Sequence, residues 1–317
     1  MVRHLRESYG LPVFDFPGPE ETPGRPLPEA DAVAWRVSSD TYDSEESWTE
    51  AFARFAAAVD LGRVRSIVVG AWEEAYEKGP EEIIGALLAA RARLTALRAL
   101  FLGDMESEEC EISWIHQGDV TPLLDGFPDL EEFGVRGGTG LVFPAVTHER
   151  LRSLTVQAGG MPAEAVRGVA ASDLPALDHL DLWLGTDAYG GDCSVEDVAP
   201  ILDGSRLPGL RHLALRNSDI QDGIAAAVAS APVVARLETL DLSMGVLTDE
   251  GAAALLGGQP LTHLRKLDLH HNYLSEPLRQ RLRSTLEGAG VVLDLDGGHA
   301  DENEWDGRVW RYVAVGE

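Results

Sequence analysis

Three features are missing from this sequence, and each absence excludes a class of protein. With only Cys110 and Cys193 among 317 residues, the chain has too few cysteines for a disulfide framework. It contains no apolar run of the roughly 18 to 20 residues that span a bilayer. Its first residues, MVRHLRESYGLPVFDFPG, contain no apolar core of a secretory signal. We therefore expect a cytoplasmic protein with no membrane partner.

Basic residues are also few. The chain carries 26 Lys and Arg against 53 Asp and Glu, which gives a formal net charge of −27. Nucleic acids and anionic membranes bind proteins through clusters of Lys and Arg, so we expect neither as a partner. The rest is ordinary for a globular chain, with 44% apolar and 25% charged residues and a mean hydropathy of −0.09. The length allows one large domain or two.

An apolar pattern of the form L-x-x-L-x-L recurs along the chain. Complete copies begin at residues 64, 97, 130, 151, 177, 210, 237 and 264, and a degenerate ninth contains Leu293 and Leu295. The mean spacing of about 28 residues falls within the roughly 20 to 29 residues of leucine-rich repeats. A repeat of this kind decides the architecture, because each unit must stack on the next.

The pattern inside each unit predicts a strand followed by a helix. Each copy ends in two apolar residues two positions apart, which is typical of a strand with one buried face. The segments between copies are rich in Ala, Leu and Arg, and several begin with a helix-capping residue. We expect an α/β leucine-rich-repeat solenoid, curved, with a parallel sheet on its concave face and helices on its convex face. The expected helices cover 81–94, 162–171, 194–202, 219–230, 248–256 and 275–286.

The first 60 residues predict an N-terminal cap. Residues 1–31 are rich in proline and predict an irregular wrap, and the alternating pattern at 32–37 predicts a strand at the edge of the sheet. Ser47 and Glu50 have the spacing of a capping box, which predicts that a short helix follows.

The repeat array is expected over residues 61–296, with eight or nine units. Residues 297–317 form the remaining end, where we expect an acidic loop and a closing strand over 309–315. Such caps are required because a bare terminal repeat would expose its apolar face to water. No second independent domain is evident.

Two stretches, LETLDLSMGVLTDEG at 237–251 and LRKLDLHHNYL at 264–274, resemble the ribonuclease-inhibitor-like class of leucine-rich repeats, and this likeness extends over about residues 60–296. The whole chain, including YGLPVFDFP, VVGAWEEAY, LFLGDMESEECEISWI and RYVAVGE, resembles a family of uncharacterised bacterial leucine-rich-repeat proteins common in actinomycetes. That family has no assigned activity, so the resemblance implies a fold and supplies no catalytic residue. One departure is the ninth position of each unit, where only Asn272 is the usual asparagine.

Alternation along each strand predicts which side chains face the concave side. If the repeat leucines point into the core, the residues between them point out of the hollow. The later units are richest in side chains suited to recognition. The candidate binding residues on this face are His179, Asp181, Trp183, His212, Arg216, Asp241, Lys266, Asp268, His270 and Asp294.

Neighbouring strands lie about 4.8 Å apart, so Trp183 should lie beside Arg216, and the carboxylates of the later units should form a column. One interpretation is a groove for a basic or mixed-charge peptide, with Trp183 as an aromatic anchor. Alternatively, these are solvated sheet residues, with Trp183 stacked on Arg216 and Lys266 neutralising its acidic neighbours.

The loops that leave the first strands are a second candidate surface. They are long and acidic, and long loops carry function more often than short ones. The alternative is a solvated acidic edge with no partner. The candidate loop residues are Trp72, Glu73, Asp104, Glu106 and Trp114.

Sequence motifs for chemistry are absent. GVRGGTG at 134–140 lacks the spacing of phosphate-binding loops, residues 294–305 lack the glycine and glutamate of a calcium loop, and no His and Cys spacing matches a zinc site. Cys110 lies among glutamates, which should raise the pKa of its thiol. We therefore expect no metal, no cofactor and no catalytic residue.

These observations predict a monomeric, non-enzymatic scaffold that binds a protein or peptide through the concave face and the strand-exit loops. The alternative is a metal-assisted enzyme, or an accessory subunit of an enzyme complex, that uses the concave carboxylates and histidines. In that reading His179, Asp181 and His212 are the candidate metal ligands.

Overall fold

The computed structural model of the chain describes residues 2–19, 26–42, 44–298, 300 and 302–317. Part of the expected wrap over 1–31, and His299 and Asp301 of the expected acidic loop, lie outside the described residues.

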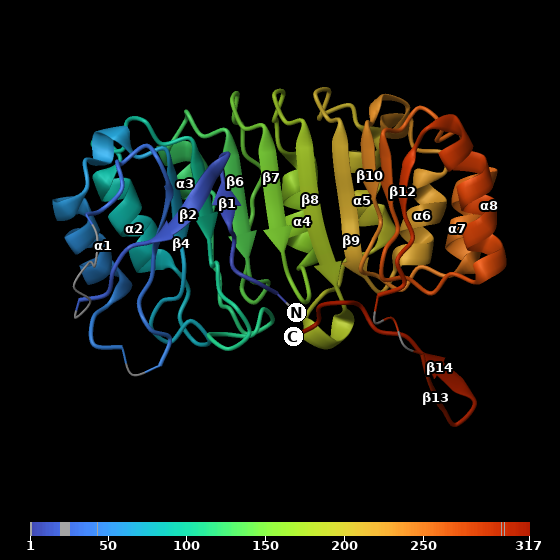
Figure 1. Cartoon of the computed structure of the whole chain (residues 1–317), viewed down its shortest axis with the longest axis horizontal. Coiled ribbons are helices and arrows are strands. Elements are labelled where there is room, and N and C mark those ends of the chain that lie inside the picture. Colours follow the sequence, from blue (N-terminus) through green and yellow to red (C-terminus); the bar gives the residue numbers. More distant parts are fainter. Residues whose placement is uncertain (1, 20–25, 43, 299, 301) are drawn as a thin grey trace.

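An open sheet of twelve strands runs through the molecule in chain order (Figure 1). Successive strands pair in parallel, except that β1 is antiparallel to β2. The repeat leucines stay in register across the sheet, for example Leu180 beside Leu213. The strands are β1 (Glu7–Ser8), β2 (Leu11–Asp15), β3 (Ala34–Val37), β4 (Ser66–Val69), β5 (Ala99–Leu102), β6 (Glu132–Arg136), β7 (Ser153–Gln157), β8 (His179–Gly185), β9 (His212–Ser218), β10 (Thr239–Asp241), β11 (Lys266–Asp268) and β12 (Val292–Asp294).

Helices follow the strands where the sequence predicts them, and Ser47 and Glu50 form the expected capping box. The unit between β6 and β7 contains no helix among its described residues, because the 16 residues at 137–152 form only a loop. The α-helices are α1 (Trp48–Ala58), α2 (Glu81–Ala90), α3 (Pro122–Gly126), α4 (Ala163–Ala171), α5 (Val195–Asp203), α6 (Gln221–Val228), α7 (Asp249–Gly257) and α8 (Glu276–Leu286). Short 3-10 helices cover Leu61–Arg63, Asp187–Tyr189, Pro232–Arg236 and Glu287–Ala289.

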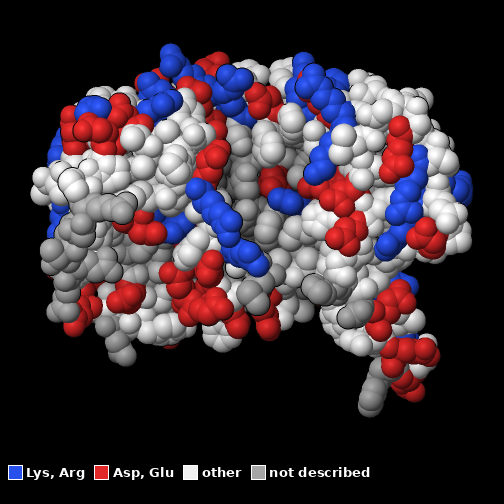
Figure 2. All heavy atoms as spheres, viewed as in Figure 1, with Lys and Arg blue, Asp and Glu red and all other residues white. Residues whose placement is uncertain are grey.

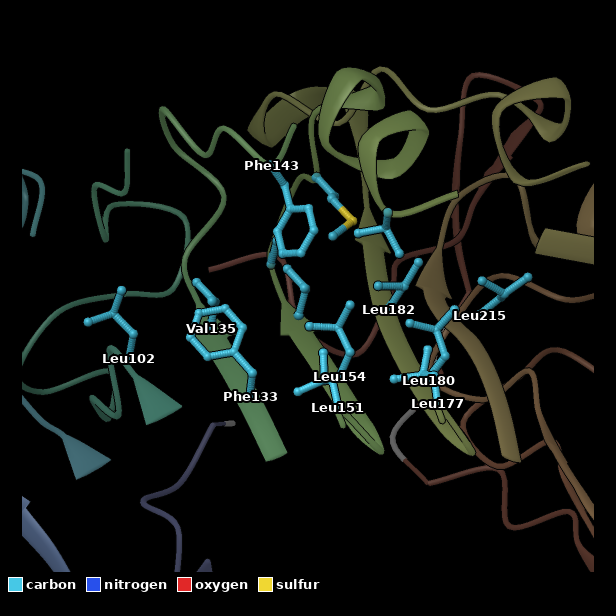
Figure 3. Close-up of a cluster of buried hydrophobic side chains, with 14 of the residues drawn as sticks. Leu102, Phe133, Val135, Phe143, Leu151, Leu154, Leu177, Leu180, Leu182 and Leu215 are labelled. Carbon is cyan, nitrogen blue, oxygen red and sulfur yellow. The ribbon is translucent and has the colours of Figure 1, made fainter. Parts of the chain in front are cut away.

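One apolar core runs between the sheet and the helices along most of the array. Figure 3 shows Leu102, Val135, Leu154, Leu182 and Leu215, which come from five successive strands and are fully buried. Each such leucine stabilises the fold by about 1.5–3 kcal/mol. Strands pack about 4.8 Å apart, whereas helices need about 8–10 Å, so stacked units bend with the sheet on the inside. The chain is therefore a curved leucine-rich-repeat solenoid.

The N-terminal end differs from the expectation. Residues 7–15 form the strands β1 and β2 instead of an irregular wrap, and Val13 of β2 pairs with Ala34, so β3 is not the edge strand. The sequence signal for β2 is the alternation of Leu11 and Val13, which places apolar side chains on one face of a strand. Pro12 lacks an N–H, and strands near an edge tolerate this loss.

The C-terminal end differs as well. Asn303–Trp305 (β13) and Arg308–Trp310 (β14) form an antiparallel hairpin that stands away from the twelve-stranded sheet (Figure 1), so no closing strand covers 309–315. The Asp306-Gly307 pair has positive φ at both residues, which is the two-residue turn that favours hairpins. No helix among the described residues is both long and apolar enough to cross a membrane.

Candidate binding surface on the concave sheet

The chain's own N-terminal segment closes the first part of the concave face. Ala34, Val68 and Phe101 point out of the sheet but are buried, and Leu11 and Val13 pack against them. β1 lies against the outward face of β4, where Ser66 Oγ donates to Ser8 Oγ at 2.9 Å, and β2 continues the sheet beside β3 (Figure 1). Apolar side chains at these outward positions therefore indicate a covering segment and leave no binding surface.

A buried ion cluster holds this segment in place. Asp104 is buried between Arg36, whose Nε lies 2.9 Å from Oδ2, and Arg136, whose Nη1 lies 3.1 Å from Oδ1. The backbone N–H of Leu5 donates to Asp104 Oδ1 at 3.0 Å. Burial raises the pKa of Asp104, but the hydrogen bond with His4 and the charges of the two arginines outweigh it and leave the pKa below its ordinary value.

Four of the loop residues predicted to face a partner therefore make contacts within the chain. Asp104 is fully buried, Glu106 accepts the backbone N–H of His4 at 3.0 Å, and Trp72 is buried with its indole donating to the carbonyl of Lys78. Glu73, which is half-buried, accepts the backbone N–H of Trp48 at 3.0 Å and so holds the start of α1. The prediction of an exposed role for Trp72 and Asp104 is wrong, because these loops fold back onto the chain.

Trp183 is not an exposed anchor. It is only 8% exposed, because Val2 and Val315 from the two ends of the described chain pack against it, together with Ile112 and Met244. Figure 1 shows the N and C labels side by side at this place. The guanidinium of Arg216 stacks over the Trp183 ring at 5.1 Å, which is the alternative weighed from the sequence. The indole N–H is buried with no acceptor among the described residues.

Arg216 holds two carboxylates at the middle of the face. Its Nε and Nη2 donate to the two oxygens of Asp181 at 2.9 and 2.6 Å, and Nη1 lies 3.4 Å from Asp241. Burial lowers the pKa of Arg216, but Asp181 and Asp241 outweigh it and raise the pKa overall. Burial raises the pKa of Asp241, which Arg216 offsets only in part.

The expected carboxylate column lies on the last three strands, since Asp241 pairs in register with Asp268, and Asp268 with Asp294. Asp268 accepts from Lys266 Nζ at 2.8 Å and contacts His270 Nδ1 at 2.7 Å. Burial raises the pKa of Asp268, yet these two hydrogen bonds hold it far below its ordinary value. The hydrogen bond to Asp268 raises the pKa of His270, so the group carries both signs of charge.

The histidines proposed as metal ligands lie close together but do not converge on one point. The rings of His179 and His212 stack at 5.6 Å with 29° between their planes, and Asp181 is held by Arg216. Burial lowers the pKa of His179. A different set, Asp268, His270 and Asp294, can offer three ligand atoms within 4.8 Å of one another.

The part of the concave face that stays uncovered lies over β8 to β12, except at Trp183 and Asn217, where the two ends of the described chain cover β8 and β9. We call this region the open face. Figure 2 shows the concave side hollowed at its middle, with acidic and basic side chains together there. The half-exposed side chains of the open face are His179, His212, Thr239, Asp241, Lys266, His270 and Asp294.

The candidate loop residue Trp114 lies in an aromatic group at the strand-exit edge, with two tyrosines that were not predicted from the sequence. Trp114 is 57% exposed, and Tyr42 and Tyr76 line the same hollow. Tyr42 and Tyr76 stack with ring centroids 5.5 Å apart. The two tyrosines lie in loops that follow β3 and β4, and no local pattern relates them to Trp114, which follows β5.

Neither cysteine is placed for nucleophilic chemistry. Burial, with the neighbouring Glu111 and Glu109, raises the pKa of Cys110 to about 11. Burial, with Asp197 and Asp192, raises the pKa of Cys193 to about 12. Both thiols are therefore protonated at neutral pH, whereas a nucleophilic cysteine needs a thiolate.

Comparison with known proteins supports the fold. Residues 237–256 match the family described as Leucine Rich repeat. A structural-genomics crystal structure of a Bacteroides fragilis protein is similar, with a TM-score of 0.75 and 27% identity over 85% of this chain and 73% of that chain. An internalin from Listeria monocytogenes is much less similar, with a TM-score of 0.37 and 14% identity over 74% of this chain and 67% of the internalin. No curated protein matches the sequence. The chain therefore has the fold of a leucine-rich-repeat protein.

Proposed function

We propose that this leucine-rich-repeat protein is a non-enzymatic scaffold that binds a protein or peptide on the open face. The observation that carries the proposal is the way the concave side holds the chain's own segment 312–317. The N–H of Ala314 donates to the carbonyl of Met244 at 2.8 Å. Asn217 accepts the N–H of Val315 at 3.0 Å and donates to its carbonyl at 2.6 Å.

These contacts support a role in peptide binding because they are the kind that an extended segment makes, with backbone groups satisfied by the sheet side and an apolar side chain in a pocket. The neighbouring open face belongs to the same sheet and is uncovered. It offers half-exposed imidazole, carboxylate and ammonium groups, which fix the register of a partner more than they add affinity.

A mixed-charge partner fits the open face better than a uniformly basic one. Arg216 already holds Asp181, and Lys266 already holds Asp268. Asp294 forms no ion pair within the described part of the chain and is the carboxylate most available to a basic partner residue. A strongly basic segment would meet Arg216 and Lys266 at the same time, and this repulsion would oppose its binding.

A capture experiment with a matched control tests the proposal. The double variant Thr239→Arg and Asp294→Arg adds three positive charges to the open face. The control Ser284→Arg and Glu287→Arg adds the same charge at exposed positions of the last helical segment. The wild type and the control should retain the same proteins from source cells, and the face variant should lose them. An identical set of proteins on all three would refute use of this face.

Within this proposal, we place the chain in the uncharacterised, actinomycete-type bacterial group with ribonuclease-inhibitor-like repeats, and we propose a cytoplasmic, monomeric protein. The alternation of one strand and one helix in most units supports this repeat class. Light scattering of the purified chain checks the oligomeric state. A mass near 34.2 kDa is expected, and twice that value would contradict it.

A metal-assisted enzyme or accessory subunit is the second candidate function. The observation that favours it is the approach of Asp268, His270 and Asp294, a donor set of carboxylate and imidazole that suits first-row divalent metals. Lys266 already donates to Asp268 and would compete with a metal ion for this carboxylate, which weakens the case for a metal site. Elemental analysis after dialysis against zinc or manganese separates the two functions, since stoichiometric metal that His270→Ala removes would support the enzyme.

A further inference from the structure

A second recognition site lies at the strand-exit edge, away from the open face. Loops that follow β3, β4 and β5 enclose a hollow of about 390 Å³, which we call the aromatic pocket. Two of its side chains are unusually exposed for their size, Tyr42 at 59% and Trp114 at 57%. The pocket is lined by Tyr42, Tyr76, Ser107, Cys110, Glu111 and Trp114.

Three tyrosine or tryptophan rings elsewhere in the protein lie beneath a guanidinium group, whereas no described guanidinium group lies over the two exposed rings of this pocket. Arg216 lies over Trp183, Arg65 over Tyr9 and Arg311 over Tyr273, with guanidinium-to-ring distances of 4.9 to 5.5 Å. No Lys or Arg of the described residues lies over Tyr42 or Trp114. The ring of Trp114, and the face of Tyr42 that is turned away from Tyr76, can therefore take a cation from another molecule.

The surroundings of the aromatic pocket are strongly acidic. The sequence contains no Lys or Arg in residues 37–53 or 99–135, the stretches that supply Tyr42, Glu111 and Trp114. Lys78 in the remaining loop is paired with Glu74. Figure 2 shows acidic side chains gathered along the lower edge of the molecule, where these loops lie in Figure 1. A negative potential of this kind attracts cations and repels anions.

We propose that the aromatic pocket binds the side chain of an arginine or lysine from a partner peptide. The aromatic faces contact the cationic group, and the exposed carboxylate of Glu111 neutralises it. Arginine is favoured, because its planar guanidinium stacks flat on an aromatic ring and also donates hydrogen bonds to a carboxylate. Buried Cys110 contributes an uncharged thiol. This site goes beyond the function proposed for the open face and does not depend on it.

Fluorine NMR of the full chain labelled with 5-fluorotryptophan tests the proposal directly. The chain has seven tryptophans, and the Trp114 resonance is assigned from the spectrum of Trp114→Phe. The probes are acetyl-Gly-Arg-Gly-amide, the matching peptide with Gln in place of Arg, and tetramethylammonium. The arginine peptide should move the Trp114 resonance saturably, and the glutamine peptide should not.

Glu111→Gln and Tyr42→Ala should each lower the affinity for the arginine peptide about two- to fivefold. This is the range expected for the loss of an exposed cation–π contact or ion pair. Glu111→Gln keeps the shape of an exposed side chain, so it separates loss of charge from loss of folding. Trp310→Phe is the matched control, since Trp310 is 49% exposed in β14 and should leave binding unchanged. The open-face variant Thr239→Arg and Asp294→Arg should also bind the peptide normally.

Three results would overturn the proposal. The first is a Trp114 resonance that does not move with the arginine peptide. The second is an equal response to the arginine and glutamine peptides, which would show that the pocket does not recognise the positive charge of the arginine. The third is a response to tetramethylammonium alone, which would make the pocket a site for a small free cation and not for a partner's side chain.

Discussion

Replacing Asp104 with asparagine should destabilise the protein more than any change to a surface ion pair. The carboxylate of Asp104 lies within 3.1 Å of Arg36 and Arg136 and accepts the N–H of Leu5. The Asp104→Asn substitution would leave two guanidinium groups near each other with no buried negative charge between them. Breaking a buried ion pair of this kind costs about 3–5 kcal/mol, so we expect the free energy of unfolding to fall by that amount.

Urea unfolding followed by circular dichroism measures this effect, with Asp129→Asn as the matched control. Asp129 pairs with Arg150 at 3.0 Å, but both side chains are at least half exposed, and such a pair contributes no more than about 1 kcal/mol. An Asp104→Asn loss no larger than that of Asp129→Asn would refute the argument that Asp104 anchors the N-terminal segment.

The same substitution predicts a pH dependence with a defined sign. The pKa of Asp104 is lower in the folded chain than in the unfolded chain, where a carboxyl of this type titrates near about 3.9. Its stabilising effect is therefore complete above that pH and is lost as the pH falls through the lower, folded value. The difference between wild type and Asp104→Asn should shrink below about pH 4. It should also fall as the pH rises through the raised pKa of His4, because the hydrogen bond with Asp104 raises that pKa.

Three further predictions concern the middle and the end of the concave face. Trp183→Ala should lower the free energy of unfolding by about 3–5 kcal/mol in urea, whereas Trp183→Phe should cost less, because it also removes an unsatisfied indole N–H; equal losses would contradict this. The pKa of His270, measured by NMR, should lie above its usual range. The contribution of His270 to stability is therefore present at low pH and is lost as the pH rises through this raised pKa. The substitution Asp268→Asn should bring the pKa of His270 back down. Asn217→Ala should speed hydrogen exchange in segment 312–317, and unchanged exchange would refute its role in holding that segment.

Most of the fold could be predicted from the sequence, because strand and helix periods are local properties. The spacing of Leu177, Leu180 and Leu182 specifies a buried strand face without reference to distant residues. The cap of α1 is specified in the same way by Ser47 and Glu50, three positions apart. Alternation also predicted correctly that Trp183 would lie beside Arg216.

Which outward side chains remain exposed could not be predicted from the sequence. Leu5 meets Asp104 across 99 positions of sequence, and Asn217 meets Val315 across 98. No local pattern encodes such contacts, so alternation alone predicts an accessible Trp183, whereas the two ends of the described chain cover it. A hint was present in Val68 and Phe101, since apolar residues at outward positions require a cover.

Site-specific photo-crosslinking tests the central claim that the open face is the binding surface. A benzoylphenylalanine replaces Val292, which is 63% exposed at the outward position of β12, and in a control replaces Val142, which is 50% exposed in the loop after β6. The account predicts that the variant at 292 crosslinks to a partner in source cells and the variant at 142 does not. Crosslinking at 142 with none at 292 would contradict it.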